Sequence, residues 1–201
     1  MKKLAVVLAA VMLAVAFASN ASAFTWAFAP ADIYLAGGLD VNTDGTNGEI
    51  LSSLADPFGG TINFTPNVQR LYIGAGWATW SHGYTGSVLY GAGSQSIKLD
   101  FDGSVTAFGG YAEPNSRDKN YDITFGLSDG SNLTKSVSGD GGADFFGFYD
   151  GAVDWVEFTS TDPLSFAIGE LAMAKCVVPE QGTLMLLGSG LLSLGLFRRK
   201  R

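Results

Sequence analysis

Apolar and polar side chains alternate with a period of two along the middle of this chain, and this pattern constrains its fold more than any other feature. The alternation is clearest at residues 97–101, 121–127 and 156–158. Because successive side chains of a strand point to opposite faces, each segment would turn one apolar face to a core. No long stretch of residues 24–176 has the period of about 3.6 residues that marks an amphipathic helix. The pattern therefore predicts many short β-strands.

Glycine and aspartate separate these strands. Shorter apolar runs predict further strands at residues 61–64, 70–74, 88–90, 105–111, 133–137, 144–149 and 165–171. The pairs Asp102-Gly103, Asp129-Gly130 and Asp150-Gly151, and the glycine-rich segment 139–142, are typical of turns. Short strands with such turns predict an all-β fold, an antiparallel β-sandwich. A helix at residues 50–54 remains open as a local alternative.

The N-terminus has the three parts of a secretory signal. Lys2-Lys3 is followed by an apolar run over residues 4–18, and then by the small-residue site Ala21-Ser22-Ala23. A permanent anchor helix is the alternative, but the run is short for one. The sequence predicts a signal peptide at residues 1–23 that is cleaved before Phe24.

The C-terminus carries a second apolar run with different flanks. Residues 182–197 contain no charge, and as a helix they would span about 24 Å, somewhat less than the hydrocarbon core of a bilayer. A buried core helix is the alternative, but the run ends in four consecutive cations, which would stay cytoplasmic. These cations are Arg198, Arg199, Lys200 and Arg201. The sequence predicts a transmembrane helix at about 182–197, with residue 24 onward on the far side of the membrane.

This tail resembles the PEP-CTERM sorting signal. The motif pair Pro179 and Glu180 comes first, then the apolar segment, then the basic cluster at residues 198–201; the third motif position is Gln181 rather than proline. The resemblance implies recognition by an exosortase-type membrane enzyme, transient anchoring in the inner membrane, and release or re-anchoring at the cell surface or outside the cell. It also implies a Gram-negative-type bacterium that makes exopolysaccharide.

Removing both terminal segments leaves one domain. We predict a signal peptide at 1–23, a β-sandwich domain at 24–176 and a sorting tail at 177–201. About 155 residues can bury a sizeable core. This domain has a single cysteine, Cys176, so no intrachain disulfide can form. A buried or inert thiol, a reactive free thiol and an intermolecular bridge all remain open for it.

The predicted domain is strongly acidic. It contains six of the twelve Lys and Arg residues and eighteen of the nineteen Asp and Glu residues, which gives a net charge near −12. Nucleic acid is excluded as a partner, because binding it needs a basic surface. Divalent cations or neutral polymers, including exopolysaccharide, suit this charge better.

The body also resembles a known type of exported domain. Four phrases carry the likeness: "WATWSHGYTG", "SIKLDFDGSVTAFGGYAEPN", "SDGSNLTKSVSGDGGADFFGFY" and "VDWVEFTSTDPLSFAIGELAMA". They resemble the jelly-roll-like body of many PEP-CTERM proteins, over residues 77–174. Where relatives often have an acidic residue, this chain has Gly169. The resemblance implies a sandwich of the kind found in carbohydrate-binding modules.

One segment has the spacing of calcium ligands. In Asp40-Val41-Asn42-Thr43-Asp44-Gly45, alternate oxygen-bearing residues precede a glycine, as in the first half of a calcium loop. A leucine stands at the twelfth position, where an EF-hand has glutamate, and Glu49 falls two residues short. Asp40, Asn42, Asp44 and Glu49 are thus candidate ligands of a looser calcium site. An Asx-rich solvent loop is the alternative.

Aromatic residues near the middle of the chain suggest sugar stacking. Trp80 and Tyr84 are the candidate carbohydrate-binding residues, since pyranose rings stack on exposed aromatic faces. Trp77 would lie on the opposite face of a regular strand because its spacing from Trp80 is odd. The alternative is that all three residues pack in the core or in loops. Trp155 is expected to be buried or half-buried.

Catalytic motifs are absent from the sequence. His82 is the only histidine, and no G-x-S-x-G elbow accompanies it. We expect it to form loop hydrogen bonds and predict that the protein is not an enzyme, although paired carboxylates leave a glycan-active enzyme open. The sequence predicts an exported, non-catalytic surface or extracellular-matrix protein. The alternative is a calcium-assisted carbohydrate-binding module.

Overall fold

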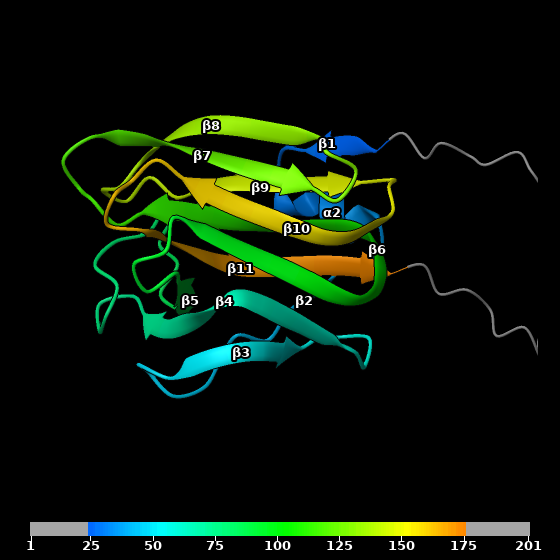
Figure 1. Ribbon diagram of the computed structural model, residues 1–201, viewed down its shortest axis with the longest axis horizontal. Coiled ribbons are helices and arrows are strands. Elements are labelled where there is room, and N and C mark those ends of the chain that lie inside the picture. The colour runs from blue at the N-terminus through cyan, green and yellow to red at the C-terminus, as the bar shows by residue number, and fades with distance from the viewer. Residues whose placement is uncertain (1–23, 176–201) are drawn as a thin grey trace, which may run out of the picture.

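Antiparallel strands dominate the protein, and one short helix accompanies them (Figure 1). The computed structural model describes residues 24–175. The predicted signal peptide, Cys176, the Pro179-Glu180 motif and the tail at 182–201 lie outside the described residues. Within the described part, no helix is both long and apolar enough to cross a membrane. The prediction of an all-β fold is confirmed.

The elements follow one another with short connections. Their order is β1 (Thr25–Ala27), α2 (Pro30–Leu35), β2 (Leu39–Asp40), β3 (Ile50–Ala55), β4 (Thr61–Tyr72), β5 (Ser87–Tyr90), β6 (Ser96–Pro114), β7 (Asn120–Leu127), β8 (Asn132–Ser138), β9 (Asp144–Tyr149), β10 (Val153–Ser160) and β11 (Phe166–Lys175).

The strands form two layers that share β6. The first half of β6 pairs with β4 and β10, and β10 continues to β7 and β8. The second half of β6 pairs with β9 and β11, and β11 continues to β2 and β5. In Figure 1, β7 and β10 lie nearer the viewer and β11 lies behind them. A sandwich results, with a core between the layers.

Two pairs of predicted strands are each one longer strand. Segments 97–101 and 105–111 both belong to β6, and Asp102-Gly103 is an irregularity within it rather than a turn between strands. The pairing with β10 shifts there, from Trp155 opposite Asp100 to Val153 opposite Val105. The extra residues kink the strand, so that it can leave one layer and enter the other. Similarly, β4 contains segment 61–64 and most of 70–74.

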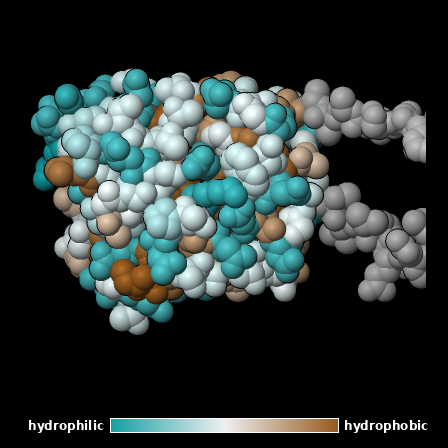
Figure 2. Space-filling view, viewed as in Figure 1, coloured by the Kyte–Doolittle hydropathy of each residue, from teal (hydrophilic) through white to brown (hydrophobic). Residues whose placement is uncertain are grey.

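Inward-facing side chains of both layers fill the core. The predicted alternation is confirmed: Ile97 and Leu99 on β6 are fully buried, while the residues between them are half-buried. Six phenylalanines have the largest fully buried side chains; they are Phe108, Phe125, Phe146, Phe148, Phe158 and Phe166. On the face shown in Figure 2, side chains of intermediate hydropathy and hydrophilic side chains cover most of the surface, and one small apolar patch lies low on this face. The core therefore relies on aromatic packing without disulfides.

The open alternative of a helix at residues 50–54 is wrong. These residues lie in β3, where Leu51 pairs with Val68 and is buried while Ile50 is 58% exposed. Pairing with β4 determines this structure, because a short apolar run fits either a helix or a strand.

The helix that does form, α2, was not predicted. Asp32 Oδ2 accepts hydrogen bonds from the N–H groups of Phe28 (2.8 Å) and Ala29 (3.2 Å), and Pro30 opens the first turn. Ile33 is fully buried against alanines of β1, β6 and β11. One buried residue in a six-residue helix leaves no periodic signal in the sequence. The helix matters for function, because α2 brings Tyr34 to one wall of a surface hollow.

Candidate functional site

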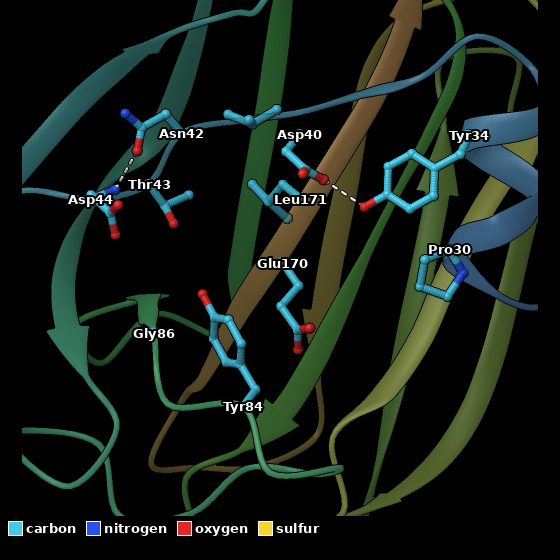
Figure 3. A pocket seen from close by; sticks show the side chains of 11 residues that line it. Pro30, Tyr34, Asp40, Asn42, Thr43, Asp44, Tyr84, Gly86, Glu170 and Leu171 are labelled. Carbon is cyan, nitrogen blue, oxygen red and sulfur yellow. Dashed lines mark hydrogen bonds between the residues drawn. The ribbon is translucent and has the colours of Figure 1, made fainter.

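An open hollow of about 540 Å³ lies among α2, β2, the segment after β2, the loop before β5, and β11 (Figure 3). Its polar lining residues are Tyr34, Asp40, Asn42, Thr43, Asp44, Tyr84 and Glu170. None of the described residues that line it is Lys or Arg. The hollow therefore offers hydrogen-bond acceptors and two tyrosine rings, and it is unsuited to an anion.

Glu170 reaches the hollow because β11 is irregular at this point. The pairing of β11 with β6 shifts between Gly169 and Ala172, and Glu170 has a backbone φ of +51°. A β-bulge re-aims the side chain that it carries, and positive φ in a residue other than glycine is a strained conformation that often marks functional sites. Figure 3 shows Glu170 between Tyr34 and Tyr84.

Tyr34 and Asp40 form the wall beside α2. The Tyr34 hydroxyl donates a 2.5 Å hydrogen bond to Asp40 Oδ1. This hydrogen bond, with partial burial and the nearby negative charges, raises the pKa of Tyr34 to about 12. The phenol therefore stays protonated, and the hydrogen bond to Asp40 holds the Tyr34 side chain beside the hollow.

The four candidate calcium ligands do not lie together in the structure. Asp40, Asn42 and Asp44 line the hollow, and the Asp44 N–H donates to Asn42 Oδ1 (2.9 Å) in an Asx turn. Glu49 does not join them, because its carboxylate pairs with the Arg70 guanidinium. Among residues 24–175, no three His, Cys, Asp or Glu side chains are grouped so that they could hold a metal ion.

Buried hydrogen bonds hold the same segment in place. Arg70 is only 4% exposed, and its Nε donates to the carbonyl oxygen of Thr43 (2.7 Å). Ser87 Oγ donates to this carbonyl as well (2.9 Å). The floor of the hollow is thus a rigid backbone tied to β4 and β5.

Trp80 and Tyr84 have different roles in the structure. Trp80 is 8% exposed, and its Nε1–H donates to Glu170 Oε1 (2.8 Å). Its buried ring offers no face for sugar stacking, so this part of the carbohydrate prediction is corrected. Tyr84 is half-buried and lines the hollow; burial first, and then the charge of Glu170, raise the pKa of its phenol.

The tryptophans do not lie on a regular strand. Trp77 and Trp80 belong to one buried cluster, together with Val88 and Ala167. The expectation that they face opposite ways applied to a regular strand, and they lie between β4 and β5 instead. The chain bends between β4 and β5, and strand alternation does not apply there. Trp155 is half-buried as predicted, with Lys98 Nζ 4.9 Å from its ring centre.

A buried carboxylate anchors the loop between β4 and β5. Glu113 is fully buried; its Oε2 accepts from Trp77 Nε1 (2.7 Å), and its Oε1 accepts from Thr79 Oγ1 (3.2 Å) and the Gly142 N–H (3.1 Å). Burial raises the pKa of Glu113 although these hydrogen bonds oppose the shift. Through them, Glu113 ties the loop to β6 and to the β8–β9 connection.

His82 forms loop hydrogen bonds, as predicted, but with one partner that the sequence did not indicate. Its Nδ1 lies 2.7 Å from Ser81 Oγ, and its Nε2 lies 3.0 Å from Glu170 Oε2. The ring also packs against Tyr111, with the ring centres 4.6 Å apart. Glu170 is 88 positions away along the chain, so no local motif could have revealed the pair.

No family model and no curated protein matches the sequence. Among solved structures, the chain is similar to a peptidoglycan O-acetylesterase, with 16% identity and a TM-score of 0.37, over 68% of this chain and 33% of that chain. It is also similar to a CBM35 from Cellvibrio japonicus Abf62, with 11% identity and a TM-score of 0.33, over 69% of this chain and 97% of that chain. The chain thus spans about a third of the esterase's length, and likenesses this distant carry no argument about function.

Proposed function

We propose that this chain is an exported protein of the cell surface or extracellular matrix, whose body binds a neutral, polyhydroxylated ligand such as exopolysaccharide. In this proposal, an exosortase-type enzyme processes the tail while residues 182–197 hold the chain in the inner membrane. The body is a jelly-roll-like sandwich, and binding is its primary task. The terminal segments of the sequence support the export route, and the hollow supports the binding.

The composition of the hollow carries the binding proposal. Sugar hydroxyls donate hydrogen bonds, and Asp40, Asn42, Asp44 and Glu170 supply acceptors around one opening. Tyr34, a residue that is 47% exposed, provides an apolar ring face beside them. Because the lining lacks cationic side chains and the domain is acidic, a neutral polymer fits better than an anionic one.

Replacing Tyr34 tests the binding proposal. We expect Tyr34→Ala to weaken binding to a neutral polysaccharide about tenfold, because the variant loses both the ring face and the ordered Asp40 contact. Leu35→Ala is the matched control, since Leu35 lies on the same helix, is 87% exposed and does not line the hollow. Calorimetric titration against a panel of neutral polysaccharides, with and without calcium, gives the affinities.

The outcomes of this titration separate the two binding hypotheses. Affinity that disappears on chelation favours a calcium-assisted carbohydrate-binding module. Affinity that is equal in Tyr34→Ala and Leu35→Ala removes the hollow as the binding site. The absence of binding to every neutral polysaccharide rejects the binding half of the proposal.

The export half has a separate test. We expect Glu180→Ala, or deletion of residues 198–201, to leave precursor that retains its C-terminal segment, since both changes alter parts of the predicted sorting signal. Intact-mass measurement of the surface-exposed protein should show the loss of both termini in the wild type. Mature copies that all retain residues 182–201 would contradict processing, while the binding measurements would stand.

A further inference from the structure

A hydrogen-bonded chain of three side chains ends at Glu170, which lines the hollow. Ser81 Oγ lies 2.7 Å from His82 Nδ1, and His82 Nε2 lies 3.0 Å from Glu170 Oε2. Glu170 itself lines the hollow. A hydroxyl within hydrogen-bond reach of an imidazole that a third group orients is the arrangement of an activated nucleophile.

The partners determine which histidine nitrogen carries the proton. Glu170 accepts one hydrogen bond at Oε1 from the Trp80 indole, and its Oε2 faces His82 Nε2. A carboxylate offers only acceptors, so Nε2 of a neutral His82 must carry the proton and donate it. Nδ1 is then the lone-pair nitrogen, and it is available to accept the hydroxyl proton of Ser81.

The surroundings hold this geometry in place. Trp80 is 8% exposed and orients Glu170, and the ring of Tyr111 packs on the ring of His82. His82 and Glu170 both have positive backbone φ, +45° and +51°. Two strained residues other than glycine face each other, and such strain persists only where the structure around it maintains it. The His82 side chain is nevertheless 43% exposed, so a substrate can reach it.

We propose that Ser81, His82 and Glu170 form a hydrolytic site for carboxylic esters. This goes beyond the proposed binding function; it depends on that function only for placing the alcohol part of the ester in the hollow. Ser81 is the nucleophile, His82 is the general base and acid, and Glu170 is the positioning residue that orients and stabilises the imidazolium.

The reaction needs only the ester and water. Ser81 Oγ forms a bond to the carbonyl carbon as its proton moves to His82 Nδ1. The bond to the alcohol oxygen then breaks, and the alcohol takes that proton from Nδ1. Water attacks the acyl-serine in the same way and gives a proton to His82; this proton returns to Ser81 Oγ as the carboxylic acid leaves.

A serine-directed probe tests the nucleophile. A fluorophosphonate should phosphonylate the full chain, purified in detergent, with the added mass mapped to Ser81 by peptide mass spectrometry. Ser81→Ala should lose the label and reduce hydrolysis of p-nitrophenyl acetate about a hundredfold or more. Ser52→Ala is the matched control, because Ser52 is exposed on β3, away from the hollow. It should keep both signals.

A second experiment does not depend on the substrate. In a Cys176→Ser background, the thiol of a Ser81→Cys variant should react with iodoacetamide at pH 7 about tenfold faster than the thiol of Ser52→Cys, since His82 would favour its thiolate. Adding Glu170→Gln should remove most of this difference and flatten the pH profile of the alkylation rate. A purely structural role for Glu170 would leave that profile unchanged.

The labelling and alkylation experiments can each support or overturn the proposal. A label on Ser81 together with the accelerated thiol supports it. No label on the wild type, a label that persists in Ser81→Ala, or equal alkylation of the two thiols overturns it. Polysaccharide binding that remains intact in any of these cases leaves the proposed binding function standing, because the titration uses no ester.

Discussion

Glu113→Ala is expected to lower the free energy of unfolding by about 3 kcal/mol. The carboxylate is fully buried and accepts hydrogen bonds from Trp77, Thr79 and Gly142. Alanine would leave the buried Trp77 indole N–H without its acceptor and would remove an acceptor from the half-buried Thr79 and Gly142. A buried unsatisfied donor costs about 1–3 kcal/mol, less any relaxation. Urea denaturation followed by tryptophan fluorescence measures the change. Glu157→Ala, on half-buried Glu157 of β10, is the control.

The pH dependence of this effect has a definite sign. Burial raises the pKa of Glu113 above its usual value of 4.5, so the folded protein binds this proton more tightly than the unfolded chain. Its contribution to stability is therefore largest below pH 4.5 and is lost as pH rises through the raised pKa. The free energy of unfolding should therefore change with pH differently in the wild type and in Glu113→Gln. The same pH dependence of stability in the wild type and Glu113→Gln would contradict the role of Glu113 as a buried anchor. A loss of stability in Glu113→Ala that is no larger than in Glu157→Ala would contradict it as well.

Glu113→Ala should also disturb the candidate site. Glu113 anchors Trp77 and Thr79, and the loop continues directly into Trp80, Ser81 and His82. A loop without this anchor would lose the geometry between His82 and Glu170, even where the core survives. Under conditions where Glu113→Ala is still folded, polysaccharide affinity and thiol reactivity at position 81 should fall together.

Asp56→Ala is expected to cost about 3 kcal/mol of stability as well. The Asp56 side chain is fully buried and pairs with Lys175 Nζ at 2.5 Å; the N–H groups of Phe58 and Gly60 donate to its other oxygen. Lys175 also donates to the carbonyl oxygen of Asp102 (2.7 Å). Removing one partner of a buried ion pair leaves the other charge uncompensated, which typically costs about 3–5 kcal/mol.

Acid titration should distinguish this pair from a surface pair. Burial alone would raise the pKa of Asp56, but the hydrogen bond from Lys175 and those from Gly60 and Phe58 outweigh it and lower the pKa below 3.8. The stabilisation is therefore complete above pH 3.8 and is lost as pH falls through the lowered pKa. Thermal denaturation between pH 2 and pH 7 should show this loss in the wild type and not in Asp56→Asn.

Asp100→Ala is the matched control for Asp56→Ala. Asp100 pairs with Lys98 at 2.6 Å, but both side chains are about a third exposed. Such a pair contributes about 0–1 kcal/mol. An equal loss of free energy of unfolding in Asp56→Ala and Asp100→Ala would show that the buried pair does not stabilise the end of β11. This end matters because β11 is the last described strand, and the predicted sorting tail follows it.

Local features of the sequence predicted the fold class well. Alternation at Ile97, Leu99 and Phe101 correctly identified the first half of β6, and Asp129-Gly130 correctly marked the turn between β7 and β8. Both signals are local: one face of a strand meets the core, and a turn needs a residue that tolerates positive φ. The six-residue helix α2 left no such signal, because a single buried residue, Ile33, cannot show a period.

The candidate site was only partly visible in the sequence. Asp40, Asn42, Asp44 and Tyr84 were selected by residue type and spacing, and all four line the hollow. Glu49 was selected by the same spacing and instead pairs with Arg70 on β4. Spacing along the chain indicates which residues could share a loop. It does not indicate that a residue on another strand, such as Arg70, will form an ion pair with one of the carboxylates.

By itself, the sequence determined the all-β class, the acidic character of the domain and its lack of disulfides, because these follow from residue period, charge and cysteine count. Only the tertiary structure decided that β6 joins both layers, that Trp80 is buried, and that Glu170 meets His82. Those outcomes depend on strand register and on one bulge in β11. A shift of a single residue would turn Glu170 to the other face, because successive side chains of a strand point to opposite faces.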